Sequence, residues 1–514
     1  MNIPLLQLSL LAACSLTGSL LAQDSNANTK AALELASPFG EHMVLQRDMP
    51  VPVWGWGKPG SSITVSVADS SATATVGDDG RWRCDLAPLK GGGPYTFTAT
   101  DGKSRIRFDD VLAGEVWICC GQSNMQMGHS RIPDIAALVE ETTGASRPVR
   151  TLQISQNISF SEEERTRAAW STTPPDSAVA AAFACKLQAA IDVPVAVVVA
   201  AWGSSSLEGW MPAALTEELP HFAAIMDQHL ADTTITDMII AANAGTPSIT
   251  KYTDDPEENA RLEKKHRSAN IYARTRPNML YNAMLHPIIP MAAQGMIYYQ
   301  GEANTRSPED MVQYSTSQRA WLELLRKRTG REDWHFLSVM LPGFARSPQI
   351  DLEAVDISTW STMRDHQLKI LELPHTAVAC TIDLGDAKNI HPKDKFPIGE
   401  RLALLARRDS CGETGLLAQG PTYLSMERAG SSVTVQFEHA KGLSTSDGES
   451  PQAFWVSDEN DQWHRADARI EGEAITLTAP EGVTPNHVRY AYAAKPALNL
   501  INEAGLPAYP FTTE

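Results

Sequence analysis

Four mostly apolar runs of strand length constrain the fold of this chain most strongly. Val195–Ala201 consists only of Val and Ala, and similar runs occupy Val116–Cys120, Met296–Tyr299 and Val378–Ile382. Strands with apolar side chains on both faces are typical of parallel sheets, in which helices cover each face. Three of these runs lead into short polar segments. Because open α/β sheets bind ligands beyond the carboxyl ends of their strands, we expect the functional site at this edge.

Helical patterns alternate with these strands. Pro174–Asp176 is predicted to open one helix. Ser307–Asp310 opens another that continues to about Arg328, with proline at the first helical position and acidic residues in the first turn. The alternation of strand and helix predicts a doubly wound α/β domain over residues 113–412. A helical, charge-rich insertion at residues 212–275 interrupts it, and we expect this insertion to shape access to the strand edge.

The two flanking regions show the period-two alternation of strands. Residues 37–112 contain several short alternating segments separated by Gly-, Asp- and Pro-rich turns, which predicts a small β-sandwich. Residues 413–514 are also β-rich. They form either a second sandwich or strands that complete the first one. The N-terminal region shows no acid, base or nucleophile in a site-like arrangement.

The first 22 residues resemble a secretory signal. An apolar stretch rich in Leu and Ala ends at Ala22 and is followed by polar residues, although no basic residue precedes Lys30. We therefore expect cleavage after Ala22 and a secreted or periplasmic protein. Leu11–Cys14 also resembles a lipobox, so a lipid-anchored Cys14 is the alternative, which we favour less. No later segment reaches the roughly 20 apolar residues of a membrane span.

Composition excludes some partners and favours others. The net charge of −18 argues against a nucleic-acid or anionic-membrane partner, since a basic surface is needed for both. No C-x-x-C pair indicates zinc, and we expect no metal or organic cofactor. Scattered free thiols are expected rather than a disulfide framework. The six cysteines beyond the leader are Cys84, Cys119, Cys120, Cys185, Cys380 and Cys411. Cys119 and Cys120 should point to opposite faces of one strand.

The polar segments at the strand ends carry the groups of a serine hydrolase. Ser123 directly follows the strand at Val116–Cys120, Asn304 follows the strand at Met296–Tyr299, and His391 lies on a loop after the last strand. Met125 occupies the position of the second glycine of a nucleophile elbow, so that motif is not met. A nucleophile, a neutral donor and a base at one sheet edge nevertheless indicate acyl transfer.

Several longer segments, taken together, resemble a known family. They are Met43–Arg47, Val51–Gly55, Gly114–Trp117, Gly121–Met125, Leu280–Met284, Gln300–Asn304, Trp360 with Arg364 and Gln367, Asp383–Asp386, Ile390–Pro392, Gly399–Ala403 and Asn502–Ala508. With them the chain resembles bacterial sialate O-acetylesterase-type members of the SGNH hydrolase superfamily over nearly its whole mature length. The resemblance implies an SGNH-type, flavodoxin-like three-layer α/β domain with flanking β-sandwich domains. It also implies a carbohydrate O-acetylesterase that works through an acetyl-serine intermediate.

The resemblance assigns four residues. The four superfamily letters map onto Ser123, Gly203, Asn304 and His391. Ser123 is then the nucleophile and His391 the base, while the amides of Ser123 and Gly203 and the side chain of Asn304 form the oxyanion hole. The superfamily often has an aspartate three residues before the histidine, but this chain has Lys388.

The residue that orients His391 is therefore open. Relatives often carry Asp-Ile-His-Pro, and Asn389 replaces that aspartate here. Asp386 and Glu302 are the two candidates, of which we favour Glu302. Gly203-Ser204 also replaces the glycine pair that is frequent in the second block.

Substrate binding is assigned to residues around this constellation. Gln122 and Trp210, with the insertion, are expected to line the sugar site, and Arg306 and Arg364 to meet a carboxylate. The expected partner is an acetylated sugar or polysaccharide. Plant-type polysaccharides such as xylan or pectin are the alternative to sialic acids. A non-catalytic carbohydrate-binding protein is a less favoured alternative, because serine, asparagine and histidine are all present.

Overall fold

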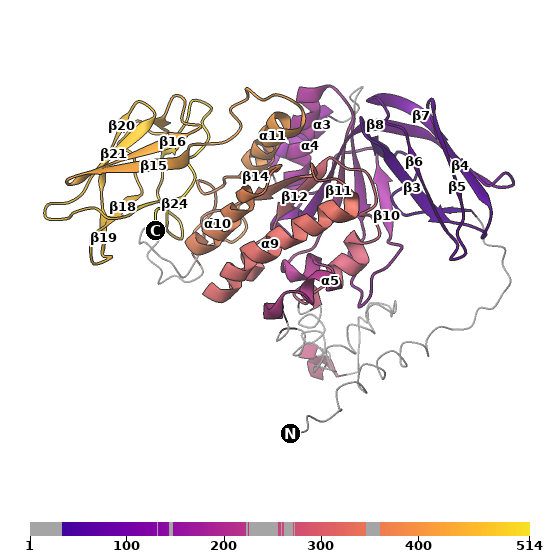
Figure 1. Cartoon of the computed structure of the whole chain (residues 1–514), viewed down its shortest axis with the longest axis horizontal. Coiled ribbons are helices and arrows are strands. Elements are labelled where there is room, and N and C mark those ends of the chain that lie inside the picture. The colour runs from indigo at the N-terminus through magenta and orange to yellow at the C-terminus, as the bar shows by residue number, and fades with distance from the viewer. Residues whose placement is uncertain are drawn as a thin grey trace, which may run out of the picture.

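A computed structural model of the chain describes residues 33–130, 132–142, 148–222, 225, 255–258, 260–261, 271, 273–345 and 360–514. The predicted leader with Cys14 and most of the predicted insertion at 212–275 lie outside the described residues. Figure 1 shows the helices and central sheet between an N-terminal β region, in indigo, and a C-terminal β region, in yellow. The site is built on the central part.

A largely parallel sheet forms this central part, with the strand order β10-β9-β11-β8-β12-β13-β14. The strands are β8 (Arg105–Gly121), β9 (Val149–Ile154), β10 (Ala168–Ser171), β11 (Val195–Ala201), β12 (Gly295–Tyr299), β13 (His335–Val339) and β14 (Thr376–Ala379). Along this path only the edge strand β10 is antiparallel to its neighbour. Numbered along the chain, the parallel strands β9, β11, β8, β12, β13 and β14 lie in the order 2-3-1-4-5-6, so the first of them, β8, lies inside the sheet. The predicted α/β class is confirmed.

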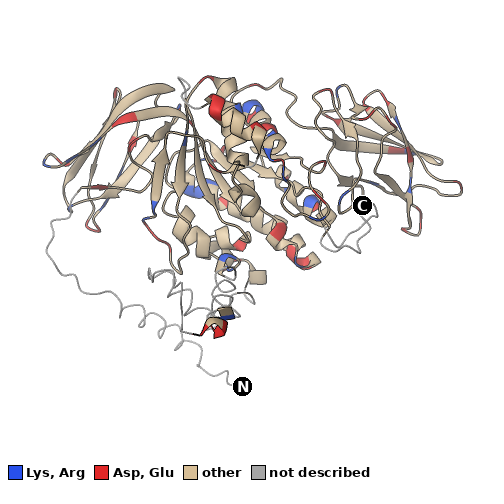
Figure 2. Cartoon of the chain, turned by 180° about the vertical axis from the view of Figure 1, so that it is seen from behind, with Lys and Arg blue, Asp and Glu red and all other residues tan. Residues whose placement is uncertain are grey.

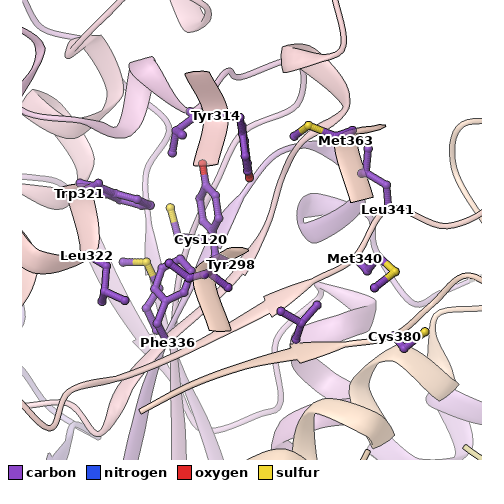
Figure 3. Packing of buried hydrophobic residues seen from close by; sticks show 14 of the residues in the cluster. Cys120, Tyr298, Tyr314, Trp321, Leu322, Phe336, Met340, Leu341, Met363 and Cys380 are labelled. Carbon is purple, nitrogen blue, oxygen red and sulfur yellow. The ribbon is translucent and has the colours of Figure 1, made fainter. Parts of the chain in front are cut away.

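Helices cover both faces of this sheet. α4 (Ala178–Ile191) and α11 (Phe396–Ser410) pack on the face that includes Cys119, while α9 (Pro308–Thr329) packs on the face that includes Cys120. In Figure 3, Trp321, which belongs to α9, lies beside Tyr298 and Phe336 of the sheet on this second face. The prediction that Cys119 and Cys120 point to opposite faces is therefore confirmed.

The ends of the long helices follow local sequence signals. Ser307 caps α9 by accepting a hydrogen bond from the Asp310 amide, and Gly330 ends the helix with a φ of 70°. The predicted start and end of this helix are confirmed. α4 begins slightly later than the predicted opening at Pro174–Asp176, because Ser177 caps it through the Ala180 amide. α10 (Trp360–Leu368) and the 3-10 helix that continues it, Lys369–Glu372, precede β14.

The N-terminal β region consists of two sheets around one apolar core. Its strands are β1 (Glu34–Leu35), β2 (Val44–Gln46), β3 (Val51–Trp56), β4 (Ser62–Val67), β5 (Ser70–Thr75), β6 (Arg81–Leu86) and β7 (Gly92–Thr100). One sheet is β1-β3-β6, and the other joins β5, β4 and β7 to β8. Buried side chains of both sheets, such as Val53 and Val65, form a shared core. This is the sandwich arrangement that the period-two pattern indicates.

One continuous strand connects this sandwich to the central sheet. The first half of β8 pairs with β7, and its second half, Glu115–Gly121, pairs with β11 and β12. The expected domain boundary at 112/113 therefore lies inside a strand. Two residues at the carboxyl end of β2 also bind β8 where it enters the central sheet. Arg47 forms an ion pair of 2.8 Å with Glu115, and Gln46 Oε1 accepts a hydrogen bond from the Val116 amide at 2.8 Å.

The C-terminal strands pair among themselves and form two four-stranded sheets, β15-β16-β21-β20 and β19-β18-β22-β24. They are β15 (Thr422–Ala429), β16 (Ser432–Glu438), β18 (Phe454–Ser457), β19 (Trp463–Arg465), β20 (Asp467–Glu471), β21 (Ala474–Thr478), β22 (Val488–Tyr490) and β24 (Phe511–Thr512), with β17 (Ser444–Thr445) and β23 (Leu500–Ile501) as a short pair. Of the two arrangements left open by the sequence, the structure has the separate one. The first sandwich is completed by β8 instead.

Charged residues of both signs occur in all three regions (Figure 2), so the negative net charge is not confined to one element. The six cysteines between residues 33 and 514 are free. Among the helices that the structure describes, none combines the length and apolar character needed to cross a bilayer.

Candidate active site

Ser123 lies directly beyond the carboxyl end of β8. Gly121 ends the strand with a φ of 143°, and a Cβ atom at this position would lie 2.1 Å from the carbonyl oxygen of Tyr299 on β12. Only glycine allows this close approach of the two strands. The chain then turns into the short helix α2 (Ser123–Gln126). The Ser123 hydroxyl therefore stands at the edge where the parallel strands end.

The His391 imidazole lies next to this hydroxyl. Its Nε2 and the Ser123 Oγ are 2.9 Å apart. Burial, and after it the Lys395 ammonium, lower the pKa of His391 below its usual value of 6.5. A neutral imidazole can accept the hydroxyl proton at Nε2 while Nδ1 carries its own proton. The structure thus brings together the two residues predicted as nucleophile and base.

Neither carboxylate predicted to orient His391 contacts its ring. Asp386 is exposed, and its Oδ1 accepts a hydrogen bond of 2.8 Å from the Lys388 amide. Glu302 is buried, and a neighbouring side-chain amide donates to its carboxylate. Among the described residues, no hydrogen bond or ion pair joins this imidazole to a carboxylate, so the expectation of a direct partner is wrong. The His391 amide instead donates to Asn389 Oδ1 at 3.0 Å.

Gly203, the second predicted oxyanion residue, lies against Ser123. A Cβ atom at Gly203 would be 3.4 Å from the Ser123 Cβ, so a side chain here would crowd the nucleophile. The Gly203 amide, however, donates to Gln126 Oε1 at 2.7 Å. Its carbonyl accepts from Arg274 at 2.8 Å, and the Arg274 guanidinium lies 4.4 Å from the Trp202 ring centroid. The amide must be released from Gln126 before it can bind an oxyanion.

Asn304 follows β12, the strand next to β8. Its Oδ1 accepts from the Leu207 amide at 3.0 Å and from Gln300 Nε2 at 2.8 Å, which fixes the orientation of the side chain. Its Nδ2 donates to Glu208 Oε2 at 2.8 Å. Because an amide nitrogen carries two hydrogens, one donor of Asn304 is not used by Glu208.

Gln122 and Trp210 make structural contacts instead of lining an open site. Gln122 Oε1 accepts from Gln300 Nε2 and from the Ala303 amide, both at 3.2 Å, and so braces the loop that carries Asn304. Trp210 is fully buried, and its Nε1 donates to Ser205 Oγ at 2.9 Å. The prediction that the Trp210 ring meets substrate is wrong, and Gln122 acts here on the loop rather than on a ligand.

Arg364 does not lie where the predicted contact with a substrate carboxylate would require it. Its side chain is 0% exposed, and its guanidinium donates to the carbonyls of Leu341, Pro342, Ala493 and Ala494 at 2.7–3.1 Å. Burial lowers the pKa of Arg364 to about 9. Since all of these partners are main-chain carbonyls, the residue joins the central domain to the C-terminal strands and cannot meet a substrate carboxylate.

Arg306 lies at the rim of the site and is already paired with acids. Its Nη2 is 2.9 Å from Glu208 Oε1, and its Nε is 3.3 Å from Asp310 Oδ2. The two acids, with His221 and Asn304, help to line a cavity of about 200 Å³. This cavity adjoins the Asn304 side of the site and offers room for part of a small ligand.

Sequence reasoning missed four polar residues of the site: Asn124, Gln126, Glu208 and Lys395. Asn124 and Gln126 are the neighbours of Ser123 in one short motif, which is a signal that could have been used. Glu208 and Lys395 are 3% and 0% exposed, and a buried charge of this kind is not visible in sequence spacing. Within the described residues there is no group of three His, Cys, Asp or Glu suited to hold a metal ion.

Comparisons with known proteins agree on one family. Residues 220–406 match the family described as carbohydrate esterase, sialic acid-specific acetylesterase. The sialate O-acetylesterase of Mus musculus is 26% identical over 501 residues, which cover 90% of this chain and 90% of that protein. That of Homo sapiens is 26% identical over 422 residues, covering 75% and 72% of the two chains.

A solved structure shares the whole architecture. The crystal structure of a carbohydrate acetylesterase from Xanthomonas citri is 28% identical with a TM-score of 0.77, and the match covers 94% of this chain and 99% of that one. An α/β fold with a serine and a histidine paired at the strand ends is the arrangement of an ester hydrolase. In sequence and in fold, the chain is similar to sialate O-acetylesterases and carbohydrate acetylesterases, and these comparisons support a carboxylic ester hydrolase.

Proposed function

We propose that this chain removes O-acetyl groups from carbohydrates as a serine esterase of the SGNH type. The observation that carries the proposal is the 2.9 Å contact between Ser123 Oγ and His391 Nε2 at the strand edge. Ser123 Oγ attacks the acetyl carbonyl while His391 accepts its proton. The imidazolium then gives this proton to the sugar oxygen as the ester C–O bond breaks. The products of this half-reaction are the sugar alcohol and acetyl-Ser123.

Water completes the cycle. His391 takes a proton from a water molecule, whose oxygen attacks the acetyl carbonyl, and returns that proton to Ser123 Oγ as acetate leaves. The oxyanion of both steps is held by the amides of Ser123 and Gly203 and by the free hydrogen of Asn304 Nδ2. Gln126 must swing away from the Gly203 amide for this to happen. No cofactor takes part in the proposed steps.

The acetylated sugar is the open part of the proposal. Sialic acid esters are favoured by the names of the relatives, and acetylated xylan or pectin is the alternative. Arg306 is the remaining candidate for contact with a substrate carboxylate, provided that it exchanges one of its two acidic partners. We also propose export of the chain to the periplasm or beyond, on the strength of the apolar segment that ends at Ala22.

Acetate release across a panel of acetylated sialic acids, xylan and pectin tests the proposal. We expect turnover of at least one of these substrates and of a generic acetyl ester, and loss of nearly all activity in Ser123→Ala with an unchanged thermal unfolding midpoint. Chelation with EDTA should leave the rate unchanged. A folded Ser123→Ala variant with wild-type turnover contradicts the assigned nucleophile, and loss of activity with EDTA that returns on metal addition contradicts the cofactor-free chemistry.

A further inference from the structure

A fully buried asparagine lies between the segments that carry the proposed catalytic groups. Asn124 is 0% exposed and directly follows Ser123. Its Nδ2 donates to Glu302 Oε1, two residues before Asn304, and to the carbonyl oxygen of Ile390 at 3.1 Å, one residue before His391. One side chain thus contacts both the oxyanion segment and the base segment, and its own backbone continues the nucleophile segment.

A buried lysine fixes the orientation of this asparagine. Lys395 is also 0% exposed, and its Nζ donates to Asn124 Oδ1. An ammonium group only donates hydrogen bonds, and a backbone carbonyl only accepts them. Turning the amide around would therefore set Oδ1 against the Ile390 carbonyl and the amide hydrogens against the ammonium. All three groups of the Asn124 amide are matched in only one orientation.

The position of Lys395 is set by the helix that it precedes. It is the residue before α11, and its carbonyl accepts from the Gly399 amide at 3.3 Å in the first turn. Gly399 packs so closely on α4 that a Cβ there would lie 2.5 Å from the Ala182 Cβ. The helix start is thereby held against α4, and the lysine lies inside the protein instead of in solvent.

We propose that Asn124 and Lys395 are positioning residues for the proposed esterase reaction: Asn124 holds the nucleophile, oxyanion and base segments in one arrangement, and Lys395 fixes the orientation of Asn124. The inference rests on the proposed function, because it assigns roles relative to Ser123 and His391. It also accounts for a histidine whose ring contacts no carboxylate among the described residues. The loop of His391 is held through Ile390 rather than through the ring.

The charges around the lysine give this inference a pH signature. The groups that face Lys395 are Glu302 from the loop after β12, Asp394 before it in the chain, His391, and the Tyr299 ring at 5.6 Å. Burial lowers the pKa of Lys395 to about 7, so the side chain is a cation below that pH, where His391 titrates. A nearby cation disfavours the imidazolium. Removal of the cation should therefore move the acid limb of kcat/KM to higher pH.

The test compares two lysines of one loop. Lys395→Met should lower kcat at least tenfold with little change in KM, and should raise the pH of half-maximal kcat/KM for a small acetyl ester. Lys393→Met, at an exposed position two residues earlier, should change neither quantity. Asn124→Asp is a second test in which Lys395 is retained. This substitution removes both amide hydrogens of Asn124, and kcat should again fall at least tenfold.

Ser123→Ala, measured in the same assays, distinguishes failure of the proposed esterase function from failure of the roles proposed for Asn124 and Lys395. If it retains turnover, the proposed function fails whatever the lysine does. If Ser123→Ala is inactive while folded Lys395→Met or Asn124→Asp keeps the wild-type kcat and acid limb, the inference alone is overturned. Should Lys395→Met fail to fold, Asn124→Asp decides by the same criterion.

Discussion

The groups on the two sides of Ser123 differ in whether their hydrogen bonds already suit the proposed reaction. On the base side, His391 already contacts the hydroxyl, and Asn124 behind it has every polar group paired. On the oxyanion side, the Gly203 amide and one hydrogen of Asn304 are occupied by Gln126 and Glu208. The base side is organised in the absence of substrate, whereas the oxyanion side must exchange at least one hydrogen bond when substrate arrives.

The largest loss of activity should come from replacing His391, the residue on the base side that contacts Ser123. His391→Ala removes the proton acceptor, and because nucleophile and base act as a unit we expect kcat to fall on the order of 10³-fold or more. Turnover of a small acetyl ester measures the loss, with thermal unfolding as the control for folding. A folded variant with less than a tenfold loss would show that another group activates Ser123.

Removal of a donor from the oxyanion side should have the next largest effect. Asn304→Ala should lower kcat about 10²- to 10³-fold, the usual result of losing one such donor. The Leu207 amide and Gln300 would also lose their acceptor, so we expect stability to fall by about 1–3 kcal/mol. Asn502→Ala, which removes a buried amide from the C-terminal strands, is the matched control, with a stability loss and unchanged kcat.

Substitution of the two acidic residues considered as partners of His391, Glu302 and Asp386, should have different effects on kcat. Glu302→Gln removes the buried charge that faces Lys395, and we expect kcat to fall about tenfold, as for loss of one charged hydrogen-bonded group. Asp386→Asn keeps an oxygen that can accept from the Lys388 amide at an exposed site, so kcat should stay within about twofold, as for most surface changes. The kcat of the two variants is compared by steady-state kinetics. A larger loss for Asp386→Asn than for Glu302→Gln would indicate that Asp386 supports His391.

Activity against pH distinguishes the two sides without a large loss of rate. Because the pKa of His391 is lowered, the folded enzyme holds a neutral base down to a pH below 6.5. We expect kcat/KM to rise with pH through this ionisation and to reach half its maximum below that value. Asn304→Ala should leave the midpoint in place, since the change lies on the other side. A wild-type midpoint above 7 would contradict the assignment of this limb to His391.

The smallest effect should come from freeing the Gly203 amide. Gln126→Leu removes the oxygen that competes for this amide, whose hydrogen bond is worth about 1 kcal/mol. We expect kcat/KM to rise by up to about fivefold, or to stay unchanged if the exchange does not limit the rate. A loss greater than tenfold would instead make Gln126 a substrate contact.

The sequence predicted those parts of the site that depend on strand ends. Ser123 and Asn304 follow apolar runs directly, and Gly121 is required by the approach of β8 to β12, so their place at one edge follows from the parallel sheet. His391 was placed by its position after the last strand together with the family motif. These are local or topological signals.

The contacts of polar side chains did not follow from such signals. Arg364 and Trp210 lie in motif-like or aromatic positions that suggested substrate contact, but both are fully buried. The acceptors of Arg364 lie near residue 341 and near residue 493, and no spacing within one segment reveals such a meeting. Lys395 shows the same difficulty, because a lysine in a charged loop is usually at the surface.

β8 runs from the sandwich into the central sheet, and its pairing with β7 shifts register between Phe108 and Val111, so this irregularity separates the alternation of its first residues from that of the rest. Its 17 residues pair with β7 at one end and lead to Ser123, the proposed nucleophile, at the other. Deleting a single residue from the stretch between this irregularity and Gly121 would turn the side chains on one side of the deletion to the opposite face, unless another bulge absorbed the change. Insertions and deletions in this stretch should therefore be tolerated far less than in the hairpin turns of the sandwich, even though the stretch begins inside the sandwich.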